Sequence, residues 1–302
     1  MFSAVNPSGL FTAENRSYKS CRRVRLKTNE MKKLFLAVSF FLTVSVYAAS
    51  VDTVAIYSAA MHKNIKTVVI KPSSDNGERL PVVYLLHGAF GSYSNWVSRV
   101  PHIKELVDRY RMIVVCPDGG FTSWYFDSPV DPNYQYETFV GVEVPQYIDA
   151  HYNTIADRKG RAITGLSMGG HGGIFLGFRH ADLYSACGST SGALHVSVIT
   201  RGYDVEKRLG DTAANKKYWT DWSALNVVEH YPKDSLAITM DCGTEDMVLP
   251  MNRAMHEKML RLKIPHDYTE RPGQHNWAYW NISIDYQLLF FRNHFDKMLK
   301  HA

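Results

Sequence analysis

Cysteine is scarce in this chain of 302 residues, which contains four. Cys21 lies near the N-terminus, while Cys116, Cys187 and Cys242 stand far apart, each in or beside an apolar run. That spacing matches neither a zinc site nor a disulfide framework, so we expect buried thiols. The sequence also lacks an H-E-x-x-H motif and any paired His/Cys motif. We therefore predict no bound metal and no cofactor.

The chain also lacks an excess of charge of either sign once the N-terminal segment is set aside. The formal net charge is +5, yet residues 1–33 carry eight of the 34 Lys and Arg residues and two of the 29 Asp and Glu residues. The remaining 26 basic and 27 acidic residues nearly cancel. Proteins that bind nucleic acid present a basic surface, so we expect no nucleic acid partner.

The sequence has no apolar run that is long enough to span a membrane. The uncharged run at residues 34–47 falls short of the roughly 20 residues that a span needs. Two lysines before it and small residues after it are typical of a secretory signal peptide, so we expect a secreted or periplasmic protein. A folded or anchoring N-terminal segment is the alternative. The predicted division is an upstream extension at residues 1–30, a signal peptide at 31–49 that begins at the true start Met31, and one domain at 50–302.

Beyond these absences, the chain shows a regular alternation of strand-like and helix-like patterns. This alternation predicts an α/β domain with a mostly parallel central sheet and helices on both faces. The predicted strands are residues 51–57 and 66–70, which form an edge hairpin, then 80–86, 112–116, 162–164, 183–189, 235–240 and 266–271. The predicted helices are residues 103–110, 137–151 with a bend at Pro145, a segment after Ser167, 252–262 and 284–298. Residues 193–235 are irregular, and we expect them to form an insertion over the site.

The stretch at residues 161–173 carries the strongest chemical signal. It reads RAITGLSMGGHGG and contains the pattern G-x-S-x-G centred on Ser167. A strand, a sharp turn and a helix in this order are typical of a nucleophile elbow, in which the serine hydroxyl projects clear of the sheet. Flanking glycines let the strand and helix backbones approach each other. Ser167 is therefore our candidate nucleophile.

Two more candidate residues follow predicted strands further along the chain. Reactive groups collect at the carboxyl ends of parallel strands, and the order Ser167, Asp246, His275 is the chain order of a Ser-Asp-His triad. His275 would take the serine proton and return it to the leaving group, while Asp246 would orient the imidazole and stabilise its charged form.

Alternatives to both partners are present in the sequence. Asp241 and Glu245 lie close to Asp246, and Asp241 is expected to be structural. His171 and His87 are rivals to His275. His171 follows the nucleophile by one helical turn and cannot easily return to the hydroxyl, and His87 is expected to position the loop around the oxyanion hole.

The oxyanion hole needs two N–H donors. We expect the backbone of Met168 to supply one, and the loop after residue 86 to supply the other, with Ala89 preferred and Phe90 second. Aromatic residues of the loop 121–136 and of the segment 193–235 are candidate substrate contacts or ordinary packing residues. The predicted substrate-binding residues are Trp124, Tyr125 and Trp277.

Together, five motifs in this order resemble a known family. LLHGAFG, SWYFDSP, TGLSMGGHGG, DCGTED and PGQHNW are similar to the putative-esterase branch of the α/β hydrolases, over residues 51–300. That branch includes S-formylglutathione hydrolases, tributyrin-type esterases, feruloyl and acetyl-xylan esterases and mycolyltransferases. The resemblance implies an α/β-hydrolase fold, the triad Ser167, Asp246 and His275, and oxyanion donors at Ala89 and Met168.

The predicted function is that of a secreted serine carboxylesterase. The resemblance implies small acyl or hydroxycinnamoyl esters as substrates, either small molecules or esters linked to plant polysaccharide. Acyl transfer to a sugar hydroxyl and an S-formylglutathione hydrolase-like thioesterase activity remain alternatives, although the predicted signal peptide counts against the second. A non-catalytic binding protein on the same scaffold would need a broken triad. The sequence does not define the oligomeric state.

Overall fold

The structure, a computed structural model, describes residues 49–199, 202–232 and 236–300. The predicted extension at 1–30 and nearly all of the predicted signal peptide at 31–49 lie outside the described residues. Within the described ranges, no helix is both long enough and apolar enough to cross a membrane.

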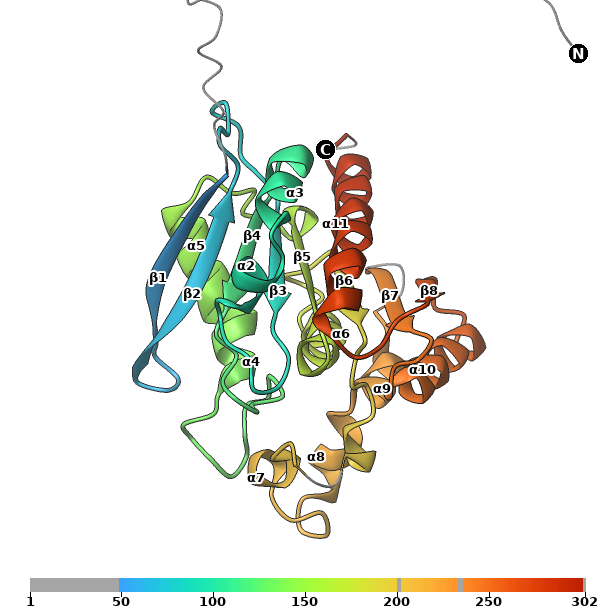
Figure 1. The fold of residues 1–302 in the computed structure, drawn as a ribbon. Helices are drawn as coiled ribbons and strands as arrows, with labels where there is room; N and C mark the ends of the chain where they lie inside the picture. The colour runs from blue at the N-terminus through green and yellow to red at the C-terminus, as the bar shows by residue number, and fades with distance from the viewer. Residues whose placement is uncertain (1–48, 200–201, 233–235, 301–302) are drawn as a thin grey trace, which may run out of the picture. The chain divides into compact units, whose positions relative to one another are not determined.

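An eight-stranded sheet in the order β1-β2-β4-β3-β5-β6-β7-β8 forms the centre of the fold (Figure 1). β1 and β2 make the predicted antiparallel hairpin at one edge, and β2 also pairs antiparallel with β4. All the other pairings between strands are parallel, which confirms the predicted sheet type. The strands are β1 (Ser50–Ser58), β2 (Lys63–Lys71), β3 (Val82–Leu86), β4 (Ile113–Pro117), β5 (Arg161–Gly165), β6 (Ala186–Thr190), β7 (Ala237–Gly243) and β8 (Asp267–Arg271).

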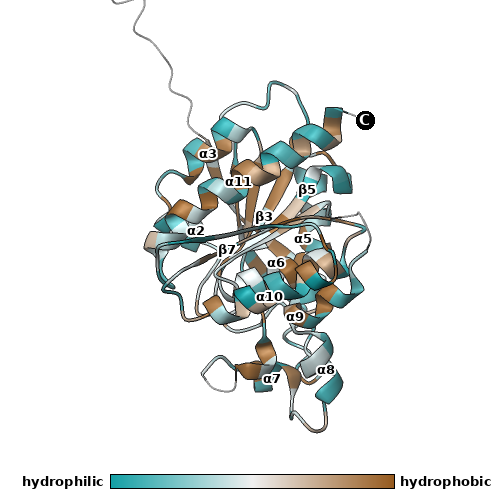
Figure 2. Cartoon of the chain, turned by 90° about the vertical axis from the view of Figure 1, so that its right-hand side faces the viewer, coloured by the Kyte–Doolittle hydropathy of each residue, from teal (hydrophilic) through white to brown (hydrophobic). Residues whose placement is uncertain are grey.

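Helices cover both faces of the sheet, as Figures 1 and 2 show from two directions. One hydrophobic cluster lies on each face. The helices on the first face are α2 (Asn95–Arg99), α3 (Ile103–Tyr110) and α11 (Trp277–Lys300). Those on the second face include α4 (Tyr136–Thr138), α5 (Val144–His151), α6 (Met168–Arg179) and α10 (Leu249–Arg261). Continuous apolar runs in the central strands follow from this, because both of their faces are buried.

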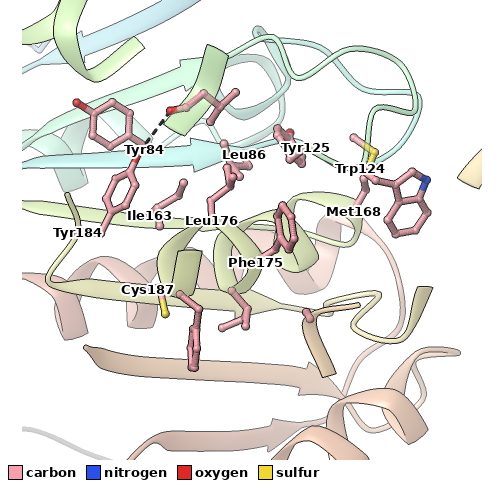
Figure 3. Packing of buried hydrophobic residues seen from close by; sticks show 14 of the residues in the cluster. Tyr84, Leu86, Trp124, Tyr125, Ile163, Met168, Phe175, Leu176, Tyr184 and Cys187 are labelled. Carbon is pink, nitrogen blue, oxygen red and sulfur yellow. Dashed lines mark hydrogen bonds between the residues drawn. The ribbon is translucent and has the colours of Figure 1, made fainter. Parts of the chain in front are cut away.

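Close packing of α6 on the sheet fixes the start of that helix. In Figure 3, Leu176 of α6 lies beside Ile163 of β5, and Phe175 precedes Leu176 on the same helix. All three side chains are fully buried, and each such burial stabilises the fold by about 1.5–3 kcal/mol. A Cβ on Gly173 would collide with the carbonyl oxygen of Gly188, so a small residue lets the helix lie directly against β6.

Three regions differ from simple expectation. The predicted helix 137–151 consists of α4, a π-helical turn at Phe139–Glu143 and α5. The predicted bend thus takes the form of a widened turn just before Pro145, because proline lacks an N–H and its ring clashes with a regular helical backbone. The described part of the predicted irregular segment contains short helices, which include α7 (Val205–Leu209), α8 (Lys216–Asp221) and α9 (Ala224–Val227). The short helix α2 was not predicted.

Candidate active site

Ser167 lies in a sharp turn between β5 and α6. Its backbone angles are φ 55° and ψ −116°, a strained conformation for a residue with a side chain. The turn is held by neighbouring segments: the Ser167 N–H donates to the Thr190 carbonyl, and the Ser167 carbonyl accepts from the N–H groups of His171 and Ala193. Such strain persists only where the surrounding structure over-determines it, and here it raises the serine side chain at the N-terminus of α6.

The flanking glycines are required by close backbone contacts. A Cβ on Gly165 would lie 2.6 Å from the carbonyl oxygen of Leu86. A Cβ on Gly169 would lie 2.6 Å from the carbonyl oxygen of His87. Both distances are far below normal contact, so β3, β5 and α6 can meet here only because these positions lack side chains.

The structure brings the three predicted residues of the triad together. His275, in the loop between β8 and α11, has Nε2 at 2.9 Å from Oγ of Ser167. Its Nδ1 lies 2.9 Å and 3.0 Å from the two carboxylate oxygens of Asp246, which follows β7. The side chain of Asp246 is fully buried, and that of His275 is 16% exposed. Ser167, His275 and Asp246 therefore form one continuous chain of hydrogen bonds.

Hydrogen bonds keep Asp246 ionised in spite of its burial. Burial by itself would raise the pKa of Asp246, but hydrogen bonds from His275 and from the N–H of Val248 outweigh it and lower that pKa below its usual value. The ionised carboxylate accepts a hydrogen bond from the Nδ1–H group of His275, and the proton stays on the imidazole. The lone pair on Nε2 is then available to Ser167.

The alternative acids lie elsewhere. Asp241 is buried and accepts hydrogen bonds from the hydroxyl of Tyr279 at 2.9 Å and from the side-chain amide of Gln287 at 2.7 Å. Its role is structural, as expected. Glu245 is exposed, and its carboxylate accepts from the side chain of Gln274. Neither carboxylate has a hydrogen bond with a histidine among the described residues.

The rival histidines are also engaged in other contacts. His171 is buried, its Nε2 lies 3.0 Å from the carbonyl oxygen of Trp222, and burial lowers its pKa to about 4. His87 donates from Nδ1 to the carbonyl of Gly88 and accepts at Nε2 from the N–H of Gly119. Burial lowers the pKa of His87 as well. His87 therefore holds the loop that carries the predicted oxyanion donor.

The N–H groups of Ala89 and Met168 have no acceptor among the described residues. Both residues line a cavity with Ser167, and Met168 is the first residue of α6, where an N–H has no intrahelical partner. The N–H of Phe90 donates to the carbonyl of Phe121 at 2.7 Å, so the second choice for this donor is ruled out. The geometry leaves two N–H groups free for an oxyanion.

Two cavities meet at Ser167 and His275. The larger, of about 310 Å³, is lined by aromatic and polar groups, and the smaller, of about 160 Å³, is mostly apolar. Side chains of the larger cavity include Phe90, Asn95, Arg99, Tyr203, Trp277 and Trp280. Those of the smaller include Trp124, Ala193, Ile199, Met247, Val248 and Met251. The segment 193–235 thus contributes to both walls, as an insertion over the site should.

Of the predicted substrate-binding residues, two lie at these cavities and one does not. Trp277 lines the larger cavity and Trp124 the smaller, where its indole N–H donates to the carbonyl of Tyr203. The prediction for Tyr125 is wrong. Its side chain is fully buried, lines neither cavity, and donates its hydroxyl to the carbonyl of His87 at 2.9 Å. Tyr125 supports the loop beneath the site and does not face the substrate.

Sequence reasoning missed several residues of the cavity walls. Asn95 and Arg99 lie one helical turn apart just after the LLHGAFG loop, and this spacing was a usable signal. Met247 and Met251 have the same spacing after Asp246. Only the tertiary structure shows that these residues face Ser167. Among the described residues, no group of three or more His, Cys, Asp or Glu side chains could hold a metal ion.

Comparisons with known proteins agree with this geometry. Residues 58–291 match the family model described as "Putative esterase". An acetyl esterase from Caldicellulosiruptor saccharolyticus is 28% identical over 249 residues, which are 76% of this chain and 92% of the relative. An S-formylglutathione hydrolase from Bos taurus is 25% identical over 202 residues, 60% of this chain and 70% of the relative. A solved structure of a ferulic acid esterase superposes with a TM-score of 0.71 at 28% identity and covers 82% of this chain and 98% of that one. These comparisons confirm the predicted resemblance and fold class.

Proposed function

This chain belongs to the "Putative esterase" family of α/β hydrolases and is a carboxylic ester hydrolase, and on that premise we propose that it works through an acyl-enzyme on Ser167. His275 takes the hydroxyl proton as Ser167 attacks the ester carbonyl. The N–H groups of Ala89 and Met168 stabilise the oxyanion. His275 then protonates the leaving alcohol and, in the second half of the reaction, activates the water that releases the acid. Asp246 stabilises the imidazolium in both halves.

The observation that carries this proposal is the continuous hydrogen-bonded chain beside two unused N–H groups. Each link, Ser167 to His275 and His275 to Asp246, measures 2.9 Å. This arrangement supports the proposed roles of nucleophile, base, orienting acid and oxyanion donors in acyl transfer. A binding protein on this scaffold would have no need to keep all of them.

The two cavities support a division of the substrate between them. We assign the acyl group to the smaller, apolar cavity and the alcohol to the larger one with aromatic walls. An apolar pocket of about 160 Å³ suits a small acyl or hydroxycinnamoyl group. The names of the acetyl esterase and ferulic acid esterase relatives agree with acyl groups between these two sizes. Release of acetate from acetylated xylan, or of ferulate from its methyl ester, tests whether polysaccharide esters are included. Cleavage of simple aryl esters alone would remove that part of the proposal.

We also propose that residues 31–49 are a signal peptide and that the esterase is exported. The support is the pattern of lysines, apolar run and small residues. N-terminal sequencing of exported protein should find a first residue near position 50. A mature chain that begins before residue 45 contradicts the proposal.

The test of the nucleophile is hydrolysis of p-nitrophenyl acetate by the full chain and by Ser167→Ala. We expect kcat to fall by about 10³-fold or more, because the residual rate comes from the oxyanion hole and binding alone. Ser98→Ala, at an exposed serine of α2, is the matched control and should retain full activity. Circular dichroism checks that both variants fold. Equal activity of wild type and Ser167→Ala would show that the nucleophile lies elsewhere.

A further inference from the structure

Of the described residues that line the larger cavity at Ser167, Arg99 alone has a permanently charged side chain. No carboxylate of the described residues lines either cavity. Within the described residues, the guanidinium of Arg99 has no ion pair and no hydrogen bond, whereas that of Arg111 pairs with Glu78 at 2.7 Å. A cation without a compensating acid beside the nucleophile raises the local positive potential where the substrate binds.

The helix that carries Arg99 is firmly attached to the rest of the site. The side-chain amide of Asn281 in α11 donates to the Arg99 carbonyl at 2.9 Å. The buried indole of Trp96 donates to the carbonyl of Leu86 at 3.1 Å and packs edge-on against Trp277 at 5.3 Å. These contacts join α2 to the end of β3 and to the start of α11. The position of the Arg99 backbone relative to the triad is therefore fixed before substrate binds, which reduces the entropy lost on binding.

The walls around Arg99 suit a ring with one apolar face and a charged substituent. Phe90 stacks on Tyr203 with ring centroids 5.5 Å apart, and Trp277 meets Trp280 edge-on at 5.2 Å. Aromatic rings of this kind offer apolar surface to a flat or puckered ring. Among the described residues, no Lys, Arg, Asp or Glu side chain lines the smaller cavity, so a charged group of the substrate belongs in the larger cavity.

We propose that the leaving group of the natural substrate carries a carboxylate and that Arg99 binds it. The inference rests on the proposed function, because it assumes acyl transfer to Ser167 with the alcohol or thiol in the larger cavity. The planar fork of a guanidinium matches the two oxygens of a carboxylate. Arg99 is then a specificity residue for the leaving group. Two sources share this chemistry: a uronic acid that bears an acyl ester, and an acidic peptide thiol such as glutathione that bears a thioester.

The experiment compares matched charged and neutral substrates on the full chain. One pair is an O-acetylated methyl glucuronoside and the methyl glucoside acetylated at the same hydroxyl. The other pair is S-acetylglutathione and its dimethyl ester. The measured quantity is the ratio of kcat/KM for the charged member to that for the neutral member, for wild type, Arg99→Gln, Arg99→Lys and the control Arg109→Gln. Arg109 is an exposed arginine of α3 that lines neither cavity at Ser167, and its replacement changes the net charge equally.

The expected result is a ratio above one in at least one pair, and the pair that shows it identifies the source. Arg99→Gln should lower that ratio about fivefold to tenfold, mainly through a higher KM for the charged substrate. A change of this size corresponds to the loss of one charge-assisted hydrogen bond at a partly exposed site. Arg99→Lys should keep part of the ratio, and Arg109→Gln all of it. Added salt should reduce the wild-type ratio because it screens exposed charges.

Three results would overturn the proposal. The first is a wild-type ratio of one or less in both pairs while p-nitrophenyl acetate is cleaved. The second is an equal fall of this ratio in Arg99→Gln and Arg109→Gln, which would indicate only a long-range effect of net charge. The third is a fall of kcat/KM in Arg99→Gln that is equally large for the charged and the neutral substrates. If no ester is cleaved at all, the proposed function itself has failed, and this outcome differs from the other three.

Discussion

Replacement of the triad acid by its neutral isostere probes the hydrogen-bonded chain most finely. In Asp246→Asn the shape of the side chain is kept, but its charge and one acceptor are lost. Oδ1 of Asp246 accepts from both the Val248 N–H and His275, each at 2.9 Å, and Oδ2 lies 3.0 Å from the same nitrogen of His275. The Val248 N–H requires an acceptor, so the asparagine amide nitrogen takes the Oδ2 position. It then faces Nδ1 of His275.

The magnitude of the effect follows from this geometry. An imidazolium and a carboxylate 2.9 Å apart attract by about 6 kcal/mol at an effective dielectric constant of about 20. Because about 1.4 kcal/mol corresponds to a tenfold change in rate, loss of this attraction in the transition state slows the reaction about 10⁴-fold. An amide N–H that faces Nδ1 also favours the tautomer with its proton on Nε2. That tautomer cannot accept the proton of Ser167.

The assay is kcat for p-nitrophenyl acetate across the pH range, with thermal unfolding as the check on folding. Glu245→Gln is the matched control, because it neutralises the adjacent, exposed carboxylate. We expect Asp246→Asn to lose about four orders of magnitude in kcat and Glu245→Gln to lose almost nothing. A loss below about tenfold in Asp246→Asn, or an equal loss in the control, would refute the assignment of the acid.

Two further predictions concern the turn and the acid stability of the fold. Gly169→Ala should lower both Tm and kcat, because the alanine Cβ would lie 2.6 Å from the carbonyl oxygen of His87 and displace the loop of the oxyanion donor. We expect the free energy of unfolding to fall by about 1–3 kcal/mol. Unchanged Tm and kcat would contradict this prediction. Burial tends to raise the pKa of Glu137, but hydrogen bonds from His180 and Arg179 outweigh it and lower that pKa. The contribution of the Glu137 carboxylate to the free energy of unfolding is therefore fully present above the unfolded pKa of about 4.3. It is lost as the pH falls through the lower pKa of the folded state. Urea unfolding should show Glu137→Gln less stable than wild type by about 2 kcal/mol near pH 7, and this difference should shrink as the pH falls below the unfolded pKa. A difference that is the same at all pH values would contradict the assignment.

The candidate triad could be predicted from the sequence because it depends on a local motif and on the order of strands and helices along the chain. Ser167 has a motif that specifies its own backbone, and the alternation of strands and helices places Asp246 and His275 at strand ends on the same edge of the sheet. A parallel sheet brings such strand ends together whatever the lengths of the connections. The positions of these residues could therefore be inferred without any knowledge of side-chain packing.

Other features depend on packing that no local pattern encodes. Tyr125 lies in an aromatic loop that resembles a binding loop, but its ring is buried beneath the loop that contains His87. The N–H of Phe90 remained the second candidate for the oxyanion hole until the structure paired it with the carbonyl of Phe121. The spacing of Asn95 and Arg99 places both residues on one side of a helical turn, but it does not show which side faces Ser167. The place of Arg99 beside Ser167 arises from the contact between α2 and α11.

The central claim is that Ser167 becomes acylated, and its most direct test is covalent capture. The full chain is treated with a fluorophosphonate, digested and analysed by mass spectrometry. The account predicts one adduct, on the peptide that contains Ser167, absent from Ser167→Ala and formed far more slowly in His275→Ala because the base is missing. An adduct on another residue, or ester hydrolysis that survives full modification of Ser167, would contradict it.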